Sequence, residues 1–106
     1  MLGIFKKDTG KVINVNDIDN LLGKVELIDI REPFEHKRGA IKTSKNIPMG
    51  EITENPDKYL EKDKEYYIVC QAGGRSAKTC KTLTNKGFNV IDVAGGYGSY
   101  LGTNRK

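Results

Sequence analysis

One cysteine stands where a buried strand would end and an anion-binding turn would begin. The apolar run Tyr66-Tyr67-Ile68-Val69 stops at Cys70, and the segment Gly73-Gly74-Arg75-Ser76 follows. Such a turn gathers backbone N–H groups, and the N-terminus of a following helix adds positive potential. A thiol that faces those amides is stabilised as the thiolate, the reactive form of cysteine. We therefore predict that Cys70 is a nucleophile and that residues 71–75 hold a small anion.

Segments with strand character alternate with segments of helical spacing through the chain. The expected strands are residues 12–15, 25–30, 46–48, 66–69 and 88–93. Helices are expected over residues 18–22, from Pro33, over residues 49–62 with a break at Pro56, from Ser76 to about Lys86, and after Gly96. The spacing of Ala77, Cys80 and Leu83 indicates the buried stripe of the fourth of these. This alternation favours a parallel sheet with helices on both faces.

Three loops are expected to meet at one edge of that sheet. In open parallel sheets the ligand lies outside the carboxyl ends of the strands. Cys70 follows one expected strand, Arg31 follows another, and Gly95-Gly96 follows a third. Their convergence predicts a site more strongly than any one of the loops does.

Length and composition indicate one globular domain. The chain has 106 residues, of which 37% are hydrophobic and 30% charged. We predict a leader over residues 1–11, a domain over residues 12–101 and a solvated tail over residues 102–106. The chain contains no apolar run of the ~20 residues that a membrane span needs and does not begin with a signal-peptide pattern, so we predict a cytoplasmic protein without a membrane partner.

The charges and the remaining titratable residues argue for a simple site. The net charge of +4 is interspersed and lacks a basic run with aromatics, which argues against a nucleic-acid partner. The two cysteines, ten positions apart without an adjacent histidine, match no zinc spacing, so we predict neither metal nor cofactor. Cys80 is interpreted as a core thiol, with a resolving partner for Cys70 as the alternative. His36 is predicted at the surface, with the rim of the pocket as the alternative.

Four motifs in order give the chain a family resemblance over residues 12–101. They are Ile28-Asp29-Ile30-Arg31-Glu32-Pro33-Phe34-Glu35, Gly39-x-Ile41 leading to Asn46-Ile47-Pro48, Cys70-x-x-Gly73-x-Arg75-Ser76, and Gly95-Gly96. With these the chain resembles a single-domain rhodanese of the rhodanese-like sulfurtransferase superfamily. The resemblance implies a three-layer α/β domain with a parallel five-stranded sheet and helices on both faces. It also implies a sulfurtransferase that takes sulfane sulfur from an anionic donor such as thiosulfate and passes it to cyanide, a thiol or a protein.

The resemblance assigns roles to individual residues. It makes Cys70 the persulfide-forming nucleophile and places Arg31 near the pocket, with Asp29 bracing the loop. Arg75 would bind the donor or brace the loop. The residues assigned to the substrate site are Gln71, Ala72, Gly73, Gly74, Arg75 and Arg31.

The chain departs from many relatives at two positions. Ala40 stands where they have histidine in a Gly-His-Ile motif, and Tyr100 stands where they have tryptophan. We expect activity to survive the first change, because sulfur transfer needs no general base once the thiolate exists. The second is interpreted as a packing substitution.

Loop length separates sulfur transfer from phosphate chemistry. Four residues lie between Cys70 and Arg75, whereas the related Cdc25-type phosphatase signature has five. The smaller ring of amides suits one sulfur atom, and each misplaced contact to a phosphate costs on the order of 3 kcal/mol. A non-catalytic binding or regulatory module and a persulfide relay to a protein partner remain alternatives.

Overall fold

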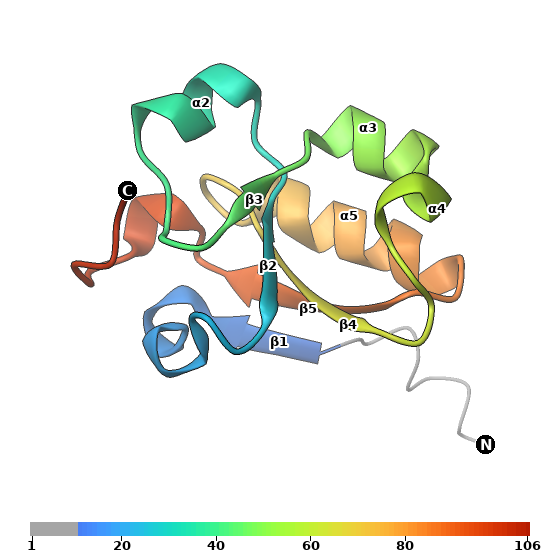
Figure 1. The fold of residues 1–106 in the computed structure, drawn as a ribbon, viewed down its shortest axis with the longest axis horizontal. Helices are drawn as coiled ribbons and strands as arrows, with labels where there is room; N and C mark the ends of the chain where they lie inside the picture. The colour runs from blue at the N-terminus through green and yellow to red at the C-terminus, as the bar shows by residue number, and fades with distance from the viewer. Residues whose placement is uncertain (1–10) are drawn as a thin grey trace.

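The centre of the protein is a five-stranded sheet in which every pair of strands is parallel, in the order β1-β5-β4-β2-β3 (Figure 1). The computed structural model describes residues 11–106, so nearly all of the predicted leader lies outside the described residues. The strands are β1 (Lys11–Asn14), β2 (Glu26–Asp29), β3 (Lys45–Asn46), β4 (Glu65–Val69) and β5 (Asn89–Ala94). The predicted fold class is confirmed.

Both faces of the sheet are buried, because neighbouring residues of each central strand point to opposite sides. Ile28 and Ile68 belong to one core cluster, and Leu27 and Val69 belong to the other. A strand buried on both faces needs apolar residues at successive positions. This explains why β2 carries Leu27 and Ile28 in succession and β4 carries Ile68 and Val69 in succession.

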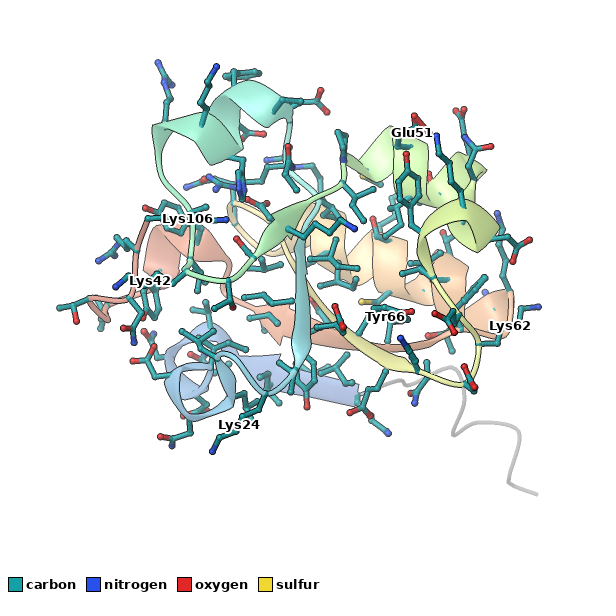
Figure 2. All side chains as sticks on the ribbon, viewed as in Figure 1. Lys24, Lys42, Glu51, Lys62, Tyr66 and Lys106 are labelled. Atoms are coloured by element: carbon teal, nitrogen blue, oxygen red, sulfur yellow. The ribbon has the colours of Figure 1, made fainter. Side chains whose placement is uncertain are left out.

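α-Helices cover one face of the sheet, and short 3-10 helices cover the other. The first face packs against α3 (Met49–Glu54), α4 (Pro56–Tyr59) and α5 (Gly74–Asn85), with Tyr66 of β4 in the same cluster (Figure 2). The second face packs against η1 (Val15–Asp17), η2 (Asp19–Leu21) and η3 (Tyr97–Ser99). The helix α2 (Pro33–Arg38) has no buried residue and stands beyond the carboxyl ends of the strands (Figure 1).

Two local predictions need correction. The helix expected over residues 18–22 is instead two 3-10 turns, and the side chain of Asn14 caps the first by accepting from the Asn16 amide. The predicted break at Pro56 is present, because α3 ends at Glu54 and Pro56 begins α4, a position that suits a residue without an N–H to donate. The buried stripe of α5 includes Cys80 and Leu83, but Ala77 is exposed. The stripe begins at Ser76 instead, because residues three, four and seven positions further along share its face.

The C-terminal tail is largely exposed to solvent but forms backbone hydrogen bonds with the domain. The amide of Lys42 donates to the Asn104 carbonyl at 2.8 Å, and the Lys106 amide donates to the Ala40 carbonyl at 2.9 Å. Ile41 and Arg105 form an antiparallel bridge between these bonds. Figure 2 labels Lys42 and Lys106, which lie in this region of contact. The prediction of a solvated tail therefore missed its attachment to the 40–44 loop.

The strand order places a switch point between β2 and β4. The chain leaves β2 through α2 to reach β3 on one side, and it leaves β4 through α5 to reach β5 on the other side. The two connections diverge and leave a crevice at the carboxyl ends, the usual ligand position in such sheets. In Figure 1, α2, the loop after β4 and the C-terminal segment gather there. No helix within residues 11–106 is long and apolar enough to cross a membrane.

Candidate active site

Cys70 lies in a cradle of backbone amides at the N-terminus of α5. The amide of Gly73 donates to the Cys70 Sγ at 3.0 Å, and the amide of Ser76 donates to it at 3.3 Å. Gly73 has a φ of 106°, a left-handed conformation that glycine adopts without strain. The helix that follows has 12 residues, so its N-terminus adds positive potential at the sulfur. The predicted strand, turn and helix are all present.

The hydroxyl of Ser76 closes this turn. It donates to the Gly73 carbonyl at 3.1 Å, and Ser76 is fully buried. Its amide and hydroxyl therefore bond the sulfur and the loop at the same time. The sequence predicted only that Ser76 begins a helix. Its bonds to the Cys70 sulfur and to the Gly73 carbonyl became apparent from the geometry of the loop.

The loop at Gly95-Gly96 packs directly on the cysteine loop. The amide of Tyr97 donates to the Cys70 carbonyl at 2.8 Å, and the amide of Gly98 donates to the Gln71 carbonyl at 2.9 Å. A Cβ at Gly96 would lie 2.4 Å from the Gln71 carbonyl oxygen, so only glycine permits this approach. The predicted convergence of these two loops is confirmed.

Arg31 is a buried, internally paired cation. Its guanidinium donates to both carboxylate oxygens of Asp29, to Gln71 Oε1 at 2.9 Å and to the Gly39 carbonyl at 2.7 Å. Its Cζ lies 4.6 Å from the centre of the Tyr97 ring. Asp29 also accepts from the Arg31 amide, as the predicted bracing role requires. Arg31 thus ties the ends of β2 and β4 together.

His36 is not a free surface residue. Its Nδ1 lies 2.8 Å from the Asp29 Oδ2, and 17% of its side-chain area is exposed. The surface prediction is therefore wrong. The reason is the geometry of α2, whose C-terminal half returns over the end of β2 and places the ring beside a buried carboxylate.

Arg75 forms a two-point ion pair with Glu35. Arg75 Nη1 and Nη2 lie 2.9 and 3.0 Å from the two carboxylate oxygens of Glu35. This pair lowers the pKa of Glu35 to about 2. Glu35 also accepts from the amide of Glu32, which caps α2. Of the two roles predicted for Arg75, this contact matches bracing, because it fastens α2 to the start of α5.

A cleft of about 330 Å³ opens beside the cysteine loop. The residues that line it are Arg31, Phe34, Glu35, Arg38, Gly39, Gln71 and Tyr97. Two of the predicted substrate residues, Arg31 and Gln71, therefore reach this cleft, whereas Cys70 does not line it and is 1% exposed. Ala72 is exposed, and Gly74 begins α5. Donor binding by these residues stays a prediction.

Phe34, Arg38 and Tyr97 were missed as members of the cleft. Only their positions, after Pro33 and Gly96, could have suggested them. Sequence spacing does not reveal which side of α2 faces the end of β4.

Cys80 has the environment of a core thiol. It is a free cysteine, 8% exposed, and packs in the same cluster as Leu83. Burial, with a smaller effect of the Asp92 charge, raises the pKa of its thiol to about 12. At neutral pH Cys80 is therefore protonated, which agrees with the core interpretation. Within residues 11–106, no three of the histidine, cysteine and acidic side chains gather as metal ligands would.

Fold and site together define a parallel α/β domain with a cysteine loop at its switch point. A family model described as "Rhodanese-like domain" matches residues 14–103. The chain therefore belongs to the rhodanese-like family, and the resemblance inferred from its motifs is confirmed.

The chain is 42% identical over 76 residues to the Bacillus subtilis protein "Putative sulfurtransferase YtwF", a match that covers 72% of this chain and 73% of that one. It covers smaller shares of two other proteins of the same organism, 63% of YqhL and 42% of YrkF. Sulfurtransferases are thus among the named relatives of this chain, and some relatives extend beyond the shared domain.

Solved structures agree with this family assignment. A rhodanese-like domain protein from Staphylococcus aureus superposes with a TM-score of 0.80 at 32% identity, covering 91% of this chain and 96% of that one. A rhodanese-related protein from Thermoplasma volcanium gives a TM-score of 0.76 at 38% identity, covering 86% and 90% of the two chains.

Proposed function

We propose that this protein is a sulfurtransferase that carries sulfane sulfur as a persulfide on Cys70. The observation that supports this most directly is the pair of amides, from Gly73 and Ser76, that donate to the Cys70 sulfur. Backbone donors at a helix N-terminus stabilise a thiolate, and they would equally stabilise a sulfur anion bonded to it. The relatives named as sulfurtransferases support the same reaction class.

The proposed reaction consists of two displacements. The Cys70 thiolate attacks the outer sulfur of thiosulfate, the S–S bond breaks, and sulfite leaves with its electron pair. The product is an enzyme persulfide. An acceptor such as cyanide then attacks the outer sulfur, thiocyanate leaves, and the Cys70 thiolate is restored. Charge and atoms balance in each step without a redox cofactor.

The surrounding residues would hold this loop and admit the donor. Arg31 is anchored by Asp29 and donates to Gln71, so it would hold the Gln71 side chain in place where it lines the cleft. The donor would enter through the cleft beside Gln71. A small amide ring leaves room for one added sulfur and little room for a phosphate, which disfavours the phosphatase alternative.

Intact-mass measurement of the full chain tests the proposal. We expect the mass of one sulfur atom to appear after treatment with thiosulfate and to disappear after cyanide, with thiocyanate released. Cys70→Ser should abolish both changes, whereas the matched variant Cys80→Ser should retain them. Thiocyanate formation by Cys70→Ser would contradict the proposal.

The two alternatives give different outcomes in the same measurement. A non-catalytic binding module would leave Cys70 unmodified by thiosulfate, polysulfide and persulfide donors alike. A relay would load Cys70 but release sulfur only to a protein. The name "sulfur carrier protein" of one relative supports a protein partner as part of this proposal. We also propose a cytoplasmic location, which rests on the sequence alone.

A further inference from the structure

Arg38 differs from the other arginines around the cleft in its contacts. Arg31 donates from all three of its guanidinium nitrogens to protein acceptors. Arg75 is paired with Glu35, which itself lines the cleft. Arg38 is exposed, lines the cleft, and has neither a hydrogen bond nor an ion pair from its side chain to any residue in the part of the chain that is described. Of the three charged residues that line the cleft, Arg31, Glu35 and Arg38, Arg38 is therefore the one without an oppositely charged partner.

An exposed aromatic ring lies beside this charge. Phe34 also lines the cleft, with 62% of its area exposed. Phe34 and Arg38 are four residues apart on α2, the spacing that brings two side chains to one side of a helix. The wall near Gln71 is formed in part by Tyr97, whose ring already stacks on Arg31. The free surface thus combines one cation with one apolar ring.

The size of the cleft exceeds what an inorganic donor fills. Its volume is about 330 Å³. This lies at the lower end of the range for pockets that bind organic ligands. Thiosulfate or cyanide would leave Phe34 uncovered.

From these contacts we infer that Arg38 is a specificity-determining residue that binds the carboxylate of an organic thiol whose apolar part lies on Phe34. This inference rests on the proposed persulfide of Cys70 and names the acceptor for it. The thiolate of the acceptor attacks the outer sulfur of the Cys70 persulfide. The S–S bond breaks, the Cys70 thiolate leaves with the electron pair, and the acceptor becomes the persulfide.

The test compares two acceptors of the same shape, 4-(mercaptomethyl)benzoate and 4-(mercaptomethyl)benzamide. Loss of the extra sulfur from Cys70 is followed by mass spectrometry at increasing thiol concentration, which separates half-saturation from the limiting rate. The native protein should half-saturate at about tenfold lower benzoate than benzamide, the effect of one charge-assisted hydrogen bond at an open site. Arg38→Gln should remove this discrimination, and Arg38→Lys should restore part of it.

Lys37→Gln provides the matched control, because it removes the same charge from the same helix at an exposed residue outside the cleft. It should retain the discrimination. Equal half-saturation for the two thiols in the native protein would overturn the inference, as would discrimination that survives in Arg38→Gln or is lost equally in Lys37→Gln. Failure of the proposed function is recognised separately, because Cys70 would then neither gain sulfur from thiosulfate nor lose it to cyanide.

Discussion

Replacing Gly96 with alanine should break the contact between the two loops that shape the site. Gly96 has a φ of 72° and a ψ of 177°, a region that essentially only glycine occupies, and a side chain there costs about 1–3 kcal/mol. The new Cβ would also lie 2.4 Å from the Gln71 carbonyl oxygen, which belongs to the backbone and cannot rotate away. The two loops must therefore separate.

The separation should break the two backbone hydrogen bonds from Tyr97 to Cys70 and from Gly98 to Gln71, at about 1 kcal/mol each. With the strain, Gly96→Ala should lower the free energy of unfolding by about 3–5 kcal/mol. This is a large part of the ~5–15 kcal/mol that stabilises most domains. Denaturant unfolding measures the total loss, and hydrogen exchange of the Tyr97 and Gly98 amides locates it.

Gly50→Ala is the control for this experiment. Gly50 lies in α3, and a Cβ added there would meet no neighbouring side chain within 4 Å. Alanine should stabilise that helix by up to about 1 kcal/mol. The free energy of unfolding of Gly96→Ala could instead lie within about 0.5 kcal/mol of the native value, or the Tyr97 and Gly98 amides could keep their protection from exchange. Either result would show that close contact between the loops does not require a glycine at this position.

Three further perturbations test other contacts. Glu35→Gln should lower the free energy of unfolding by about 1 kcal/mol at pH 7, because it removes a partly exposed ion pair. The difference between the two proteins should shrink as the pH falls from about 4.5 towards about 2, because the Glu35 carboxylate becomes protonated over that range and the ion pair is lost. Denaturation curves taken at several pH values measure this difference. In Cys80→Ala, mass spectrometry should still show the addition of one sulfur atom to Cys70, since burial keeps the Cys80 thiol protonated and unreactive. If the variant no longer gains this sulfur, Cys80 is not merely a core residue. Deletion of residues 103–106 should expose the Lys42 amide to exchange and lower the free energy of unfolding by about 1–2 kcal/mol; unchanged protection would show that the tail bond is dispensable.

The elements of the sheet could be predicted because their signals are local. Leu27 and Ile28 in β2, like Ile68 and Val69 in β4, are apolar at successive positions, a pattern typical of a strand buried on both faces. The helix predicted over residues 18–22 failed for a local reason too. Asn14 caps a 3-10 turn that begins at Val15, and the short connection to β2 closes as two such turns.

The partners of the charged residues could not be predicted. Arg75 and Glu35 are 40 positions apart, as are Arg31 and Gln71. From the sequence alone, each of these side chains could equally have been exposed to solvent or bound to a ligand. Whether a guanidinium meets a carboxylate or a substrate depends on how α2 sits over the ends of β2 and β4, and that placement follows from packing.

By itself, the sequence determined the fold class, the family and the cysteine loop, because apolar periodicity, glycine positions and the spacing of Cys70 and Arg75 are properties of neighbouring residues. Only the tertiary structure decided how the cations are used. It buries Arg31 against Asp29, pairs Arg75 with Glu35 and brings Arg38 to the cleft. A buried charge needs a partner inside the protein, whereas a charge at an open cleft keeps its bonding capacity for a ligand.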